Sequence, residues 1–181
     1  MKLHLGCGQR YIDGYIHIDV NNFDHIDYNI PIDNLSIFEN DSADIIYASH
    51  VLEYFDREEV LKVLQEWKRV LKKGGILRVA VPDFNGLLEV YKKTKDLDKI
   101  LGPLYGKWNI DNDKFIYHKT VYDFNSLSEV LKKVGFKSIS LWDWKEVFKD
   151  NLSFDDHSQA YFPHMEKENG IHVSLNIECK N

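Results

Sequence analysis

The sequence is poor in cysteine and has no long apolar run. Only Cys7 and Cys179 are present among 181 residues, too few for a disulfide framework or a cysteine-rich metal site. No stretch approaches the ~20 apolar residues of a membrane-spanning helix. Residues 1–6 also lack the apolar core of a secretory signal. We therefore expect no membrane span and a cytoplasmic location.

Basic clusters are scarce as well. The formal net charge is −6, and the paired lysines at 72–73, 92–93 and 132–133 fall on the ends or faces of expected helices. This distribution disfavours a nucleic-acid partner. No spaced group of histidine, cysteine and carboxylate residues indicates a metal site, so none is expected. The hydrophobic fraction of 44% and the charged fraction of 29% are ordinary for a globular protein, and the length predicts a single domain over residues 1–181.

Strand-like and helix-like segments alternate along the first two-thirds of the chain. Strands are predicted at 3–5, 15–20, 43–48, 76–81, 137–141 and 171–179, with a weaker extended segment at 26–30. Helices are predicted from Asp56 to Gly74-Gly75, over 84–95, and from Ser126 to Gly135. Such alternation indicates parallel strands joined by crossovers. We predict an α/β, Rossmann-like doubly wound domain with a mostly parallel sheet and an antiparallel closing strand.

Two helix starts carry the capping-box pattern, Asp56 with Glu59 and Ser126 with Glu129. Between the helices, the pattern dissolves at about 96–120 into an aromatic-rich insertion, and a late loop runs over about 145–170. Loops held by a rigid scaffold often carry recognition residues. We therefore expect the insertion and the late loop to cover a substrate pocket.

Polar residues follow the first two predicted strands where a ligand of an α/β sheet binds. Gly6 and Gly8 lack side chains that would block a ligand approaching the backbone, and Asp19 is placed to accept hydrogen bonds from both hydroxyls of a ribose. The turn lacks the third glycine of the dinucleotide fingerprint. Only ten residues separate Gly8 from Asp19, which leaves little room for a helix to hold a pyrophosphate. The pattern favours a ligand that contains adenosine without phosphates.

Four motifs in this order resemble a known family. They are Leu3-His4-Leu5-Gly6-Cys7-Gly8, Asp19, the run 42–53 and the run 66–75, and the runs 76–84 and 163–170 add to the similarity. Together they resemble class I S-adenosylmethionine-dependent methyltransferases, in particular the small predicted methyltransferases of the type 11-like group. The resemblance covers nearly the whole chain and implies S-adenosylmethionine as the cofactor.

The resemblance also implies which residues bind this cofactor. The turn of Gly6, Cys7 and Gly8 would approach its methionine and ribose portions, and Asp19 would hold the ribose hydroxyls, next to Val20. Asp33 is the candidate for the adenine amino group, with Asp27 as the alternative. The segment Ala48, Ser49 and His50 would lie near the sulfonium. The chain departs from the family at Tyr54, where histidine is common.

Three residues are candidates for catalysis. Methyl transfer to a hydroxyl requires removal of a proton, and imidazole suits this because its pKa lies near neutrality. His50, at the strand end next to the cofactor, is the first candidate base; the alternative is a packed or hydrogen-bonded histidine. Asp83 either orients the substrate or caps the helix that follows it. His118 lies in the insertion, and His157 and His164 in the late loop offer acceptor contacts.

The leading hypothesis is a methyltransferase that acts on a small molecule or a sugar of a glycan. The first alternative is a non-catalytic module that binds S-adenosylmethionine, because binding glycines persist without a catalytic base. The second is a nicotinamide-dependent oxidoreductase, which would need the fuller glycine fingerprint that this turn lacks.

Overall fold

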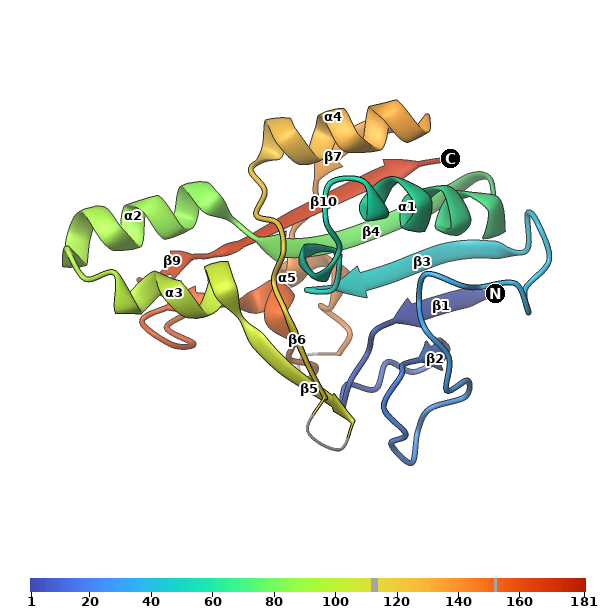
Figure 1. The fold of residues 1–181 in the computed structure, drawn as a ribbon, viewed down its shortest axis with the longest axis horizontal. Helices are drawn as coiled ribbons and strands as arrows, with labels where there is room; N and C mark the ends of the chain where they lie inside the picture. Colours follow the sequence, from blue (N-terminus) through green and yellow to red (C-terminus); the bar gives the residue numbers. More distant parts are fainter. Residues whose placement is uncertain (112–113, 152) are drawn as a thin grey trace.

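One six-stranded sheet forms the centre of the molecule (Figure 1). The computed structural model describes residues 1–111, 114–151 and 153–181. The strand order is β2-β1-β3-β4-β10-β7. The strands are β1 (Lys2–Leu5), β2 (Ile16–Ile18), β3 (Ala43–Ser49), β4 (Leu71–Pro82), β7 (Lys137–Leu141) and β10 (Ser174–Lys180). The pairs β1–β2, β1–β3 and β3–β4 are parallel, whereas β10 is antiparallel to both β4 and β7. The predicted mostly parallel sheet with an antiparallel closing strand is confirmed.

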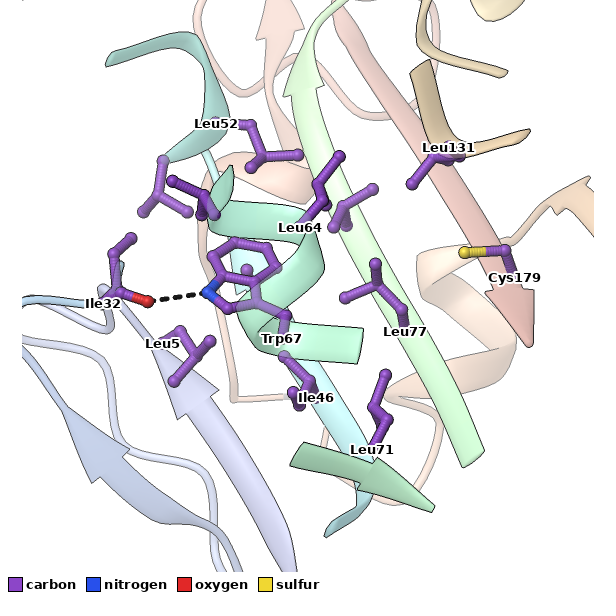
Figure 2. Close-up of a cluster of buried hydrophobic side chains, with 14 of the residues drawn as sticks. Leu5, Ile32, Ile46, Leu52, Leu64, Trp67, Leu71, Leu77, Leu131 and Cys179 are labelled. Atoms are coloured by element: carbon purple, nitrogen blue, oxygen red, sulfur yellow. Dashed lines mark hydrogen bonds between the residues drawn. The ribbon is translucent and has the colours of Figure 1, made fainter. Parts of the chain in front are cut away.

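Two helices cover one face of the sheet. These are α1 (Glu59–Val70) and α4 (Phe124–Val134), which contact each other (Figure 1). Apolar residues at helical spacing on α1, among them Leu64 and the fully buried Trp67, pack on sheet residues such as Ile46 and Leu77 (Figure 2). Burial of this stripe against the sheet provides the main core of the protein.

The other face is covered by loops and one short helix, α5 (Trp144–Val147). Its core is a smaller aromatic cluster in which Tyr47, Trp142 and Phe148 contact one another and Phe154 contacts Phe148. The remaining elements are η1 (Leu52–Tyr54), α2 (Phe84–Thr94), α3 (Asp98–Tyr105), the hairpin β5 (Lys107–Asp111) and β6 (Lys114–Tyr117), η2 (His157–Gln159), β8 (Tyr161–Phe162) and β9 (Ile171–His172). The hairpin extends beside the carboxyl ends of β1 and β3 (Figure 1).

The segment between β2 and β3 has no helix, and side chains of α1 hold it in place. The Trp67 indole N–H donates to the carbonyl of Ile32 at 2.7 Å (Figure 2). Glu66 accepts the amide of Leu35 at 2.9 Å, and Arg69 donates to the carbonyls of Leu35 and Phe38. These bonds satisfy backbone groups that a helix would have paired internally. The predicted weak segment at 26–30 contributes only an isolated bridge between Ile18 and Tyr28.

Several predicted boundaries are wrong. The helix α1 ends at Val70, because Leu71 is already extended, and Gly74-Gly75 lie in an irregular start of β4 where the register shifts. The second capping box joins Asp123 to Ser126, not Ser126 to Glu129. The insertion, which was expected to lack regular structure, contains the helix α3 and the β5–β6 hairpin. Residues 112–113 of the insertion and residue 152 of the late loop lie outside the described residues.

The chain order reverses at β1, which has β2 on one side and β3 on the other. In parallel sheets a ligand crevice forms at such a switch point, outside the carboxyl ends of the strands. The fold thus brings the residues after β1, β2 and β3 to one edge. Among the described residues, no helix is both long and apolar enough to cross a membrane.

Candidate active site

A cavity of about 720 Å³ lies at this edge of the sheet. One end is formed by the residues after β1, β2 and β3, and the other by the insertion and the late loop. The candidate residues that line it are Gly6, Cys7, Gly8, Asp19, Val20, Asp33, Ser49, His50 and His118. Ala48 is buried in β3 and does not line the cavity as the described residues define it.

Asp19 is fixed by the backbone of two turns. Its carboxylate accepts the amide of Gly8 at 2.8 Å through Oδ2 and the amide of Asn21 at 2.8 Å through Oδ1. The residue is 6% exposed but lines the cavity. Each oxygen has a further lone pair, so the carboxylate can accept two hydroxyl donors without moving.

The two glycines of the turn are required for different reasons. Both have positive φ, +63° at Gly6 and +54° at Gly8. A Cβ on Gly6 would lie 2.3 Å from Cγ1 of Val51, so this glycine permits close packing inside the protein. A Cβ on Gly8 would meet no atom within 4 Å and would project into open space. Only Gly8 therefore matches the expectation that a side chain would obstruct a ligand.

The structure separates the two candidates for the adenine contact. Asp33 lines the cavity, next to Ile32, which Trp67 holds. Asp27 does not line it in the described part of the chain; its Oδ2 accepts the amide of His17 at 2.7 Å. Among the described residues, Asp33 is thus the one of the two candidates that lies on the cavity wall.

His50 ends β3 in a left-handed conformation, with φ of +54°. Such values are uncommon outside glycine and cluster at functional sites. Its Nε2 lies 3.0 Å from Oγ of Ser174 on β10. Burial, followed by the nearby His157, His118 and His172, lowers the pKa of His50 well below its usual value, with the His157 backbone opposing the shift. The ring is thus neutral at physiological pH.

His118 lines the cavity from the insertion. Its Nδ1 lies 2.8 Å from the Pro103 carbonyl, and its ring stands edge-on to Tyr54 at 4.7 Å between centroids. Burial lowers the pKa of His118. Gly106 allows this placement, because a Cβ there would lie 2.6 Å from the His118 ring.

Asp83 is not among the described residues that line the cavity. Its carboxylate caps α2 by accepting the amides of Asn85 and Gly86 at 3.1 and 3.2 Å, and burial raises its pKa. Its interpretation as a helix cap is the one that the geometry supports. Of the two histidines in the late loop, His157 lines the cavity and His164 does not.

Sequence reasoning did not single out Glu53. Its side chain is 0% exposed, and within the described residues neither carboxylate oxygen has a hydrogen-bond partner. Oε1 lies 3.5 Å from Nδ1 of His50 and 3.9 Å from Nε2 of His118. Burial raises the pKa of Glu53 to about 8. The signal was its place in the run 42–53, three residues after His50.

The insertion supplies apolar walls. Trp108, Ile110 and Ile116 of the hairpin line the cavity. Among other aromatic residues, Tyr105, Phe115 and Tyr117 of the insertion are exposed, whereas Trp142 packs in the aromatic cluster behind the sheet. In the described part of the chain, no group of three histidine, cysteine or acidic residues is arranged to hold a metal.

The fold is Rossmann-like, and the cavity at the switch point of the sheet is lined by a glycine turn after β1 and by an acidic residue after β2. Residues 3–79 match the model of a methyltransferase domain. The chain is thus similar to methyltransferases over residues 3–79, and its fold is that of class I S-adenosylmethionine-dependent methyltransferases.

Solved structures with this fold resemble the whole chain. An S-adenosylmethionine-dependent methyltransferase of Archaeoglobus fulgidus is 15% identical, with 99% of this chain and 85% of that chain covered and a TM-score of 0.55. One of Methanosarcina mazei is 19% identical, with coverage of 99% and 91% and a TM-score of 0.58. The 1,6-didemethyltoxoflavin-N1-methyltransferase of Burkholderia thailandensis is 10% identical, with coverage of 99% and 70% and a TM-score of 0.57. No curated protein sequence matches the chain.

Proposed function

We propose that the protein transfers the methyl group of S-adenosylmethionine to a small-molecule or glycan acceptor bound between the insertion and the late loop. The observation that carries the proposal is a continuous cavity of about 720 Å³ whose two ends differ chemically. Its volume falls within the range of ligand pockets that hold molecules of this size. The net charge of −6 disfavours a nucleic-acid acceptor.

The residues at the first end fit the cofactor. Asp19 keeps lone pairs for the ribose hydroxyls while two backbone amides hold it. The open space in front of Gly8 leaves room for a ligand against the backbone. Asp33 can accept from an adenine amino group. Bound S-adenosylmethionine supplies an activated methyl group on its sulfonium.

The residues at the second end fit an acceptor. Trp108 and Ile116 offer apolar contact, and His50 and His118 bring imidazole nitrogens to the wall between the two ends. Holding the acceptor in line with the methyl group is the larger task of the protein, since the cofactor is already activated. The Burkholderia enzyme named above was solved with bound 1,6-didemethyltoxoflavin and S-adenosylhomocysteine, which is consistent with a small acceptor for this fold.

Calorimetric titration tests the cofactor assignment. Wild type and Asp19→Ala are titrated with S-adenosylmethionine, S-adenosylhomocysteine and the oxidised nicotinamide cofactor, with the exposed Asp24→Ala as a matched control. We expect the first two ligands to bind wild type and the control at micromolar concentration and to lose affinity for Asp19→Ala. Binding of the nicotinamide cofactor alone would refute the proposal. Tight cofactor binding without methylated product across broad acceptor libraries would instead establish the non-catalytic module.

A further inference from the structure

The buried carboxyl group of Glu53 is the feature that the proposed cofactor and acceptor sites leave unexplained. A buried acid normally has hydrogen-bond donors around it. The groups that face this one are titratable side chains from every neighbouring element: His50 after β3, Tyr54 of η1, His118 of the insertion, Tyr122 before α4, with His157 and His172 behind His50. Two of these, His50 and His118, approach Oε1 directly.

Hydrogen bonds fix the proton on the far side of the His50 ring. The Asn176 amide donates to the carbonyl of Ser158 at 2.9 Å, so its oxygen faces Ser174. The hydroxyl of Ser174 donates to that oxygen at 2.9 Å and has no second hydrogen. It must therefore accept from Nε2 of His50, and the neutral ring carries its lone pair on Nδ1. That lone pair faces Glu53.

The same argument applies to His118. A carbonyl can only accept, so Nδ1 of His118 donates to Pro103 and the neutral ring carries its lone pair on Nε2. This lone pair also faces Oε1 of Glu53, at 3.9 Å. Two imidazole lone pairs and a carboxyl oxygen thus converge with no donor among them unless a proton is present. The arrangement requires one shared proton, which agrees with the raised pKa of Glu53.

We propose that His50, Glu53 and His118 form one proton-sharing unit that receives the acceptor's proton, with Glu53 as the positioning residue, and hence that the acceptor is an amine or a hydroxyl. This inference rests on the proposed function. The acceptor nitrogen or oxygen forms the bond to the methyl carbon, and the electron pair of the broken C–S bond stays on sulfur. The shared proton moves to one imidazole and the acceptor's proton passes to the other, so that the unit holds two protons and ionised Glu53 lies between two imidazolium rings. The unit then releases one proton to water.

The proton-sharing unit can be tested without an acceptor. Protein with ¹³C-labelled glutamate carboxyls and ¹⁵N-labelled histidines is titrated by NMR, with Glu53→Gln used for assignment. We expect a glutamate carboxyl with a midpoint near 8 and imidazole signals that shift at the same pH. The signal can be assigned even if Glu53→Gln folds poorly. The pKa values of Glu59 and Glu66 are shifted in the opposite direction, below the usual glutamate value, so neither should titrate near pH 8.

Removing one lone pair should change the affinity of Glu53 for its proton. In His118→Gln the amide can donate to Glu53, so we expect its midpoint to fall by about one pH unit, a tenfold change in proton affinity. The exposed His164→Gln is the matched control and should leave the midpoint unchanged. A carboxyl that titrates near 4.5, or that ignores His118→Gln, would overturn the proposal.

The outcome also separates this inference from the proposed function. Binding of S-adenosylhomocysteine to wild type is measured by calorimetry in the same preparation. If Glu53 and the histidines titrate together but this ligand does not bind, the proton-sharing unit stands and the methyltransferase assignment fails. If the ligand binds but Glu53 titrates independently, the assignment stands and the unit is refuted.

Discussion

Replacement of Glu53 by glutamine should make the protein more stable at alkaline pH. In the folded state the pKa of Glu53 is raised from 4.5 to about 8 by burial. An acid whose pKa is raised by folding favours the folded state only while protonated, so wild type loses stability as pH rises from about 4.5 to about 8. At about 1.4 kcal/mol for each pH unit, the loss is on the order of 5 kcal/mol. Glutamine cannot ionise, so the Glu53→Gln variant should not lose this stability as the pH rises.

Urea denaturation followed by circular dichroism, at intervals from pH 5 to pH 9, measures this effect. The free energy of unfolding of wild type should fall relative to Glu53→Gln across this range, with the difference complete above pH 8. The histidines are present in both proteins, so their direct contributions largely cancel. Glu129→Gln is the control, because Glu129 is 73% exposed and its replacement should leave the pH dependence unchanged.

Parallel curves for wild type and Glu53→Gln would refute the reasoning. They would mean that Glu53 is ionised at little cost in the folded state, and therefore that it has donors or water around it. A difference that grows toward low pH would contradict the sign of the argument, since it would show a carboxyl stabilised in its charged form.

The glycine turn and its supporting helix give further predictions. Gly6→Ala should lower the free energy of unfolding by about 2–3 kcal/mol, as overpacking of a core does, because the new Cβ would lie 2.3 Å from Cγ1 of Val51. Gly8→Ala should cost only about 1–2 kcal/mol for its positive φ but should abolish binding of S-adenosylhomocysteine in calorimetry; equal loss of stability in both variants would contradict this. Trp67→Phe should cost about 1–3 kcal/mol in urea denaturation, since a buried carbonyl loses its donor, and a neutral effect would show that water replaces the indole.

Much of the fold follows from local pattern in the sequence. The sheet strands alternate with helices whose apolar residues recur at helical spacing, and this pattern survives tertiary packing. The helix end at Val70 was not predictable, because Gly74-Gly75 looks like a helix terminus and is in fact a bulge set by pairing with β3. The insertion was predicted, but the helix α3 and the hairpin inside it were not, because such short elements carry little local signal in the sequence.

The candidate site was predicted at the cofactor end and only in part at the acceptor end. Gly8 and Asp19 are neighbours of strands, so their position follows from topology. The position of Glu53 relative to the strands gives no such indication: its significance lies in its burial and in its approach to His118, which depends on how His118 returns from the insertion. Asp83 illustrates the converse, since a strand-end acid and a helix cap have the same sequence pattern.

The bonds from α1 to the segment after β2 have a consequence for motion. The amide of Leu35 is bonded to Glu66, and the carbonyls of Ile32 and Leu35 are bonded to Trp67 and Arg69. Exchange of that amide with deuterium should therefore require the opening of α1, and the wall around Asp33 should exchange as slowly as the core. The hairpin that lines another part of the cavity forms a separate two-stranded sheet among the described residues. Product should leave the cavity on that side, at a rate set by the hairpin.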